Sequence, residues 1–234
     1  MNVYTYKTDA MRRILQLVSR GYIRYTFGKC ELKKLQSLIC KFDDRYKINL
    51  TTQQRYRAKA KGEANTQLVL FFNGKTIEWW LLVTPGTGLI EELEILKNTE
   101  KRFERIELTG YSLCKTPKKG ESASWTWRMT ENNYLAWQER LRSSVIAKND
   151  ELIRQAMFSL KRTPAFSGSR KQAFTLFRQA KSHWRKINGS EWPYENIYIG
   201  WFGKFQKAQT IDSSELLEKS KKQLNKGKSS ILLS

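Results

Sequence analysis

The side chains in this sequence whose types and spacing favour chemistry are cations, and the densest set lies between Leu152 and Ser190. This stretch of 39 residues contains nine Lys or Arg and no Asp or Glu. The nine are Arg154, Lys161, Arg162, Arg170, Lys171, Arg178, Lys181, Arg185 and Lys186. Apolar residues keep helical spacing within it, which predicts a folded basic surface and not a loose tail. A surface of this kind suits a polyanion, and nucleic acid is the partner we favour.

A helix is predicted over about Ser169 to Lys186, with an apolar face and a basic one. Four apolar residues recur at three- and four-residue spacing and superpose on one face: Ala173, Phe177, Ala180 and Trp184. Four cations cluster about a third of a turn away, beside Phe174: Lys171, Arg178, Lys181 and Arg185. Ser169, with Gln172 three residues later, also fits a capping box.

The segment before this helix suggests a DNA-binding geometry. A predicted helix ends ahead of Pro164, a short turn follows, and the basic helix comes next, as in a helix-turn-helix motif with a lengthened turn. In that geometry Arg170, Lys171 and Gln172 at the helix start would face base edges. Three later cations would face phosphates: Arg178, Lys181 and Arg185. The alternative is a solvated basic face without a ligand.

A second basic patch lies on a short helix predicted to begin near Thr51 or Thr52. Four cations surround one aromatic residue in this patch: Arg55, Tyr56, Arg57, Lys59 and Lys61. Alternating cations and a ring suit a nucleic acid strand, because phosphates meet the charges and a base stacks on the ring. An exposed helix with Tyr56 packed inward explains the same residues equally well.

No catalytic motif is complete, and no cofactor motif is present. The GKT sequence at 74–76 lacks the earlier glycine of a phosphate-binding loop, since that position is Val69. His183 is the single histidine, so paired-histidine and zinc-hydrolase sites are not predicted, and we expect it on the surface of the basic helix. Adjacent acids at 43–44 and 91–94 do not converge on a helix, so a metal site would need distant carboxylates.

The net charge of the chain is +21, and it is unevenly distributed. Residues 1–62 carry +11, residues 63–150 carry zero and residues 151–234 carry +10. Aromatic residues make up 12% of the chain, which argues against wholesale disorder. We predict an α+β sheet domain at 1–130, a helical basic region at 131–208 packed on it, and a mobile basic tail at 209–234.

The neutral middle of the chain predicts an antiparallel sheet. Strands at Gln67–Phe72 and Ile77–Val83 flank Asn73-Gly74, a signal for a two-residue hairpin turn. Both arms are apolar, so this 67–83 hairpin should be central, with N-terminal helices flanking the sheet. Further strands are predicted at about 105–115, 123–129 and 197–202. The predicted fold is therefore α+β, with a largely helical basic C-terminal half that starts after Thr130.

Tryptophans are expected in two environments. Trp79-Trp80 and the alternating Trp125 and Trp127 are predicted to be core residues, although stacking platforms for bases are an alternative. A later aromatic segment, from Trp192 and Tyr194 to Phe202, is expected to include exposed rings.

The cysteines and the apolar runs indicate the cellular compartment in which the protein is expected. Cys30, Cys40 and Cys114 are widely spaced and odd in number, which favours reduced thiols in a cytoplasmic protein. No secretory signal is predicted, and the longest strongly apolar run, at 79–83, is too short to cross a membrane. We expect an intracellular protein associated with nucleic acid.

The function expected from the sequence is nucleic-acid binding without catalysis, with DNA favoured over RNA. The chain would be an accessory or architectural subunit of a nucleoprotein assembly, such as one of a mobile element or defence system, and would contact other protein subunits. One alternative is a metal-dependent nuclease or strand-transfer enzyme, which would cleave labelled DNA or RNA when magnesium or manganese is added. Another is an adaptor or inhibitor that docks its basic face on an acidic protein. Oligomeric state is left open.

Overall fold

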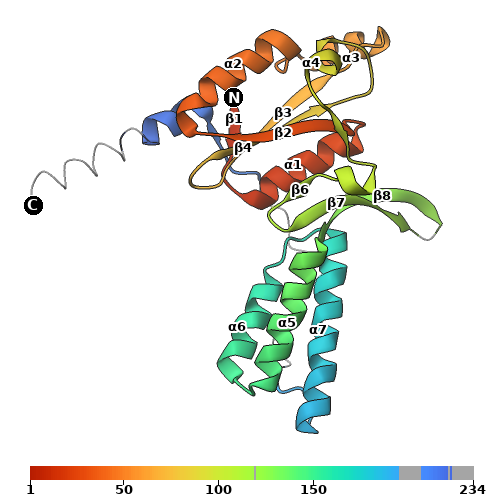
Figure 1. The fold of residues 1–234 in the computed structure, drawn as a ribbon, viewed down its shortest axis with the longest axis vertical. Coiled ribbons are helices and arrows are strands. Elements are labelled where there is room, and N and C mark those ends of the chain that lie inside the picture. Colours follow the sequence, from red (N-terminus) through yellow and green to blue (C-terminus); the bar gives the residue numbers. More distant parts are fainter. Residues whose placement is uncertain (119, 195–206, 221, 223–234) are drawn as a thin grey trace, which may run out of the picture. The chain divides into compact units, whose positions relative to one another are not determined.

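The computed structural model describes residues 1–118, 120–194, 207–220 and 222 of the chain. The protein is a mixed α+β protein in which antiparallel strand pairing predominates, as predicted. Its contacts define two compact units (Figure 1): unit 1 comprises Met1–Glu104 with Lys207–Ser234, and unit 2 comprises Arg105–Gln206. The strands predicted at about 105–115 and 123–129, expected in the first domain, lie in unit 2 with the helices that follow them.

Unit 1 is built on a six-stranded sheet. Its strands are β1 (Asn2–Tyr4), β2 (Arg24–Cys30), β3 (Thr66–Phe72), β4 (Ile77–Val83), β5 (Lys97–Asn98) and β9 (Thr210–Asp212). Its helices are α1 (Lys7–Ser19), α2 (Leu35–Tyr46), α3 (Thr52–Ala60) and α4 (Leu89–Leu93), with 3-10 turns η1 (Leu32–Lys34) and η2 (Arg102–Glu104). The strand order is β5-β2-β4-β3-β1-β9, and β1 runs parallel to β3 while the other pairs are antiparallel.

The hairpin of β3 and β4 is central, as predicted, but its turn is longer than predicted. The strands pair from Thr66 with Val83 to Phe72 with Ile77, so four residues, 73–76, connect them. The Asn73 side-chain oxygen accepts hydrogen bonds from the backbone N–H groups of Lys75 (3.0 Å) and Thr76 (2.9 Å). This side-chain turn replaces the two-residue turn that Asn73-Gly74 suggested, because Asn side chains can stand in for backbone acceptors.

Helices cover both faces of this sheet. The α2 helix lies on one face, where Ile39 and Phe42 are buried with Leu70 and Leu81. The α1 helix lies on the other face (Figure 1), and its Arg13 donates a hydrogen bond to Gln67 of β3 (2.9 Å). The near-continuous apolar composition of β3 and β4 is explained by this double coverage.

The chain returns to unit 1 near its C-terminus. Residues 210–212, expected in a mobile tail, form β9 and pair with β1. The N-terminal ammonium of Met1 lies 2.8 Å from an Asp212 oxygen, and Leu216 is buried in the core. The strand predicted at 197–202 lies outside the described residues.

Unit 2 combines three strands with three helices. The strands are β6 (Glu107–Leu108), β7 (Tyr111–Lys118) and β8 (Glu121–Met129), in the order β6-β7-β8. The helices are α5 (Glu131–Ile146), α6 (Asp150–Lys161) and α7 (Ser167–Asn188). Thr130 and Asn149 cap α5 and α6, since their side chains accept from backbone N–H groups three residues later. Both helix starts were predicted.

The start of α7 lies directly on β8. The backbone N–H of Gly168 donates to the Thr126 hydroxyl (2.9 Å), and a Cβ atom at Gly168 would lie 2.7 Å from the Trp127 carbonyl oxygen. Trp127 is fully buried beside Phe166, the residue that precedes the helix. Only glycine permits this close approach of helix to strand, so position 168 determines how α7 sits on the sheet.

Aromatic rings from the following segment pack against the C-terminal part of α7. Trp192 and Tyr194, the two rings of the predicted aromatic segment that the structure describes, are 2% and 3% exposed. Trp192 packs edge-on against Phe177 and Trp184 at centroid distances of 6.1 and 5.9 Å. The segment folds back on the helix because these rings bury more apolar area together than apart. Residues from 195 to 202 lie outside the described part.

Replacing Gly168 by valine should destabilise unit 2. Overpacking of this kind costs about 1–3 kcal/mol, because the strand backbone must move to admit the side chain. Urea unfolding followed by tryptophan fluorescence would measure the loss. The matched change Ser182→Ala, on the exposed part of α7, should leave the unfolding midpoint nearly unchanged. Equal midpoints for the two variants would contradict the packing described for Gly168.

Candidate nucleic-acid interface

The basic face predicted on α7 is present and lies opposite the buried face of the helix. Ala173, Leu176 and Ala180 are buried in unit 2. Lys171, Arg178 and Arg185 are exposed and stand seven residues apart. Seven residues make almost two turns, so the three form one row with a spacing of about 10 Å along the helix. We call Lys171, Arg178 and Arg185 the α7 row.

The members of the α7 row differ in how far acids neutralise them. Among the described residues, Lys171 and Arg178 have no carboxylate within ion-pair distance. Arg185 lies 2.6 Å from a carboxylate oxygen of Glu191, and this contact lowers the pKa of Glu191. Lys171 and Arg178 therefore carry charge that no acid of the described chain balances.

Two further predicted residues flank the α7 row. The Lys181 ammonium lies 5.8 Å from the centroid of the Phe177 ring, which leaves the cation half-buried at the side of the helix. Phe174 is also half-buried beside the row. Both are next to the row, as the helical spacing predicted.

Two of the residues predicted at the helix start have structural contacts instead. Arg170 is 9% exposed, and its guanidinium donates to the Lys161 carbonyl (2.9 Å) at the end of α6. Burial lowers the pKa of this guanidinium. Gln172 accepts from the Met129 N–H (2.7 Å) and donates to the Met129 carbonyl (3.3 Å). The geometry that would point Arg170 and Gln172 at base edges is wrong, because the start of α7 lies on β8.

The predicted cap and motif differ from the structure for the same reason. Ser169 is buried, and its hydroxyl donates to the Pro164 and Phe166 carbonyls, so it forms no capping box with Gln172. The helices α6 and α7 run alongside α5 as a bundle (Figure 1), whereas the two helices of a helix-turn-helix cross steeply. The likeness to that motif therefore does not extend to its geometry.

The second basic patch belongs to unit 1, on α3 and the residue after it. Tyr56 is 75% exposed, which contradicts the alternative in which it packs inward. Arg57, Lys59 and Lys61 are exposed as well. Arg55 is half-buried and donates to the Ile48 carbonyl (3.2 Å), so its guanidinium holds the preceding loop. The patch thus presents three cations and one ring to solvent.

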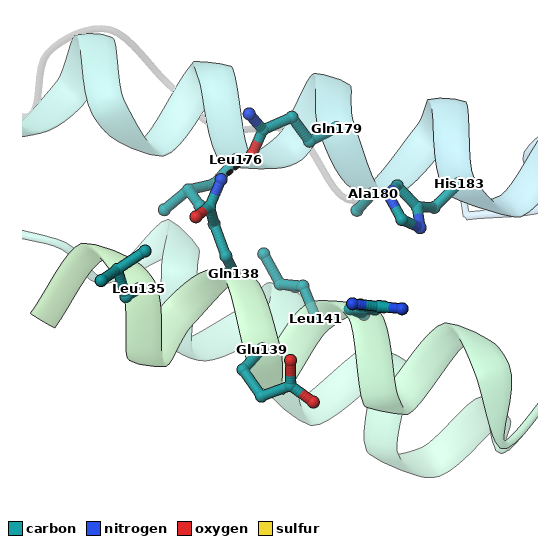
Figure 2. Close-up of a pocket in the computed structure, with 9 residues that line it drawn as sticks. Leu135, Gln138, Glu139, Leu141, Leu176, Gln179, Ala180 and His183 are labelled. Atoms are coloured by element: carbon teal, nitrogen blue, oxygen red, sulfur yellow. Dashed lines mark hydrogen bonds between the residues drawn. The ribbon is translucent and has the colours of Figure 1, made fainter. Parts of the chain in front are cut away.

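A groove between α5 and α7 was not anticipated from the sequence. It encloses about 490 Å³ and is lined on one side by Leu135 and Glu139 and on the other by Leu176 and His183. Figure 2 shows Gln138 reaching across it, where its amide donates to the Gln179 oxygen (3.1 Å). His183 is exposed at the rim of this groove, on the surface of the basic helix as expected.

Within the described part of the chain, no three His, Cys, Asp or Glu side chains are grouped closely enough to hold a metal ion. No helix of the described residues combines the length and apolarity needed to cross a bilayer. Comparisons with protein-family models, with curated proteins and with solved structures give no match.

The variants Arg170→Ala and Arg178→Ala should differ in stability, because Arg170 is buried and hydrogen-bonded whereas Arg178 is exposed. Loss of Arg170 removes a charged hydrogen bond at the end of α6 and should cost about 1–3 kcal/mol of unfolding free energy. Loss of exposed Arg178 should change stability by less than about 0.5 kcal/mol. Urea unfolding of the two variants measures both values, and equal losses would contradict the contacts described.

Proposed function

We propose that this protein binds nucleic acid through the α7 row, as a non-catalytic accessory or architectural subunit of a nucleoprotein assembly. The observation that carries the proposal is the pair Lys171 and Arg178, exposed on the face opposite the core and unbalanced by any acid of the described chain. Unbalanced cations raise the energy of the free protein by mutual repulsion, and a phosphate backbone relieves that repulsion.

The length of the α7 row suits a phosphate backbone. Fourteen residues of helix separate Lys171 from Arg185, which is about 21 Å. A duplex presents about one charge per 1.7 Å of its axis, so several phosphates lie within reach of a row this long. The contacts are to backbone charge, and base-specific recognition is not part of the proposal. The preference for DNA over RNA, which depended on a helix-turn-helix geometry, is not carried forward.

The exposed residues Tyr56, Arg57, Lys59 and Lys61, which we call the α3 patch, are a second candidate contact. The exposed Tyr56 ring beside Arg57 and Lys59 has the composition of a stacking platform for single-stranded bases. Because it belongs to unit 1, its contribution is testable independently of the α7 row.

The double variant Lys171→Ala with Arg178→Ala should weaken binding and reduce its salt dependence. Each phosphate contact contributes about 0.9 to the slope of log affinity against log salt on duplex DNA, so two lost contacts should flatten it by about 1.8. Fluorescence anisotropy with a labelled 30-base-pair duplex, titrated at several salt concentrations, measures the slope. The control, Lys41→Ala with Lys75→Ala, removes two exposed cations from unit 1 and should change the slope much less.

The variant Glu191→Gln should strengthen binding and increase its salt dependence. Removing this carboxylate leaves Arg185 unpaired, so affinity should rise and the slope should steepen by about 0.9 if the freed cation gains a phosphate contact. If the salt slope is unchanged in both the double variant and Glu191→Gln, α7 is not part of the binding surface. Absence of binding to any oligonucleotide at moderate salt would favour an acidic protein as the partner.

A further inference from the structure

The six-stranded sheet of unit 1 has an edge that its outermost strand covers only in part. That strand, β5, pairs with β2 only through Arg24 and Tyr25. Ile95, two residues before β5, is 92% exposed, so the preceding chain does not extend this pairing. On its other side β2 pairs with β4 along its whole length. Among the described residues, positions 26–30 of β2 therefore have a neighbouring strand on one side only.

The open side of β2 presents backbone groups. The Ile23 carbonyl accepts from the Thr99 N–H (2.9 Å), so odd-numbered residues direct their N–H and C=O groups toward β5 and even-numbered ones toward β4. The ladder between β2 and β4 has no register shift, so this alternation continues along the strand. Phe27 and Lys29 therefore direct N–H and C=O groups outward, past the point where β5 ends. A row of this kind is a template for a further strand.

One face of the open edge is apolar. Gly28 lies opposite Trp79 of β4, and a Cβ atom at Gly28 would lie 2.6 Å from the Trp79 ring. Because glycine has no side chain, the half-buried Trp79 ring can lie over β2. The same ring packs edge-on against Phe42 of α2, with 5.0 Å between centroids. A strand added at the edge would place every second side chain beside Trp79, and apolar side chains suit that position.

The opposite face of the open edge carries cations. Phe27 and Lys29 share this face by strand alternation. Phe27 is 50% exposed, and the Lys97 ammonium lies 4.8 Å from the centroid of its ring. Lys29 lies 3.0 Å from a Glu78 oxygen, whereas Lys97 has no carboxylate within ion-pair distance in the described part of the chain. Acidic side chains of an added strand suit this face, because Lys97 lacks an acidic partner.

We propose that the open edge of β2, residues 26–30, binds an extended acidic segment of a partner protein as a further strand of the sheet. The segment alternates apolar residues, which face Trp79, with Asp or Glu, which face Lys97. A second copy of this chain does not fit, because two chains of net charge +21 repel each other, and pairing two β2 edges adds Lys29 of both copies to one short ladder. The proposal adds a protein partner to the nucleic-acid contact proposed for α7.

The first test is amide hydrogen exchange of the full-length protein, followed residue by residue with NMR. The probe is a six-residue peptide of alternating glutamate and valine, capped at both ends. In the free protein the N–H groups of Phe27 and Lys29 should exchange fast. Those of Thr26 and Gly28, which face β4, should exchange slowly. Saturating peptide should slow exchange at Phe27 and Lys29 by at least about tenfold, and a peptide of alternating lysine and valine should leave both rates unchanged.

The second test uses matched variants and a fluorescent form of the glutamate peptide. Lys29→Pro removes an outward N–H and leaves the ladder to β4 intact, while its control, Lys29→Gln, loses the same charge and keeps the N–H. Affinity measured by anisotropy should fall about tenfold more in Lys29→Pro than in Lys29→Gln. Lys97→Glu, an exposed change that keeps the test valid if Lys29→Pro fails to fold, should weaken the glutamate peptide and strengthen the lysine peptide. Lys41→Glu, on the exposed side of α2, should change both affinities much less.

Four results would overturn the proposal. Unchanged exchange at Phe27 and Lys29 with the glutamate peptide would mean that the edge binds no acidic segment. Equal protection by both peptides would show that the stated charge of the partner is wrong. Slow exchange in the free protein would mean that the edge is already covered, by a second copy if the rates depend on protein concentration. Protection by a 30-base-pair duplex and not by the peptide would assign the edge to nucleic acid. None of the first three results involves α7, so the proposed function is tested separately.

Discussion

The close packing of Gly168 on β8 is the contact on which the candidate interface depends. It brings the backbone of α7 onto the strand and places Arg170 against the end of α6 and Gln172 against Met129. With these positions buried or paired, the α7 row of Lys171, Arg178 and Arg185 is exposed on the opposite face of the helix. A Cβ atom at residue 168 would meet the Trp127 carbonyl oxygen at 2.7 Å, so any larger residue there disturbs the contact between α7 and β8.

Cations in this protein fall into two physical classes. Some stabilise structure: Arg170 donates to the Lys161 carbonyl, Arg55 donates to the Ile48 carbonyl, and Arg24 pairs with Glu91. Others, such as Lys171 and Arg178, are exposed and unbalanced by acids of the described chain. Only the second class is available to a phosphate, because the first already has oxygen partners. A net charge of +21 therefore overstates the number of groups that can contact a ligand.

Much of the fold was predictable because its signals are local. The apolar arms around Asn73 predicted the central hairpin, and Thr130 and Asn149 marked the starts of α5 and α6. The turn at Asn73 was misjudged because its side chain competes for the backbone N–H groups, which extends the loop to four residues. The burial of Trp192 was missed because it depends on rings that lie on α7, away from the segment itself.

The sequence by itself determined that α7 is amphipathic and basic, since helical periodicity places Lys171, Arg178 and Arg185 in one row wherever the helix lies. It also determined the α+β class, through alternating and apolar runs of strand length. Only the tertiary structure decided that Arg170 and Gln172 face inward, that Tyr56 faces outward and that β6, β7 and β8 belong to the same unit as α5, α6 and α7. The physical reason is that the exposure of a side chain depends on which element packs against its helix or strand. Sequence periodicity shows which residues share a face, but it does not show which element covers that face.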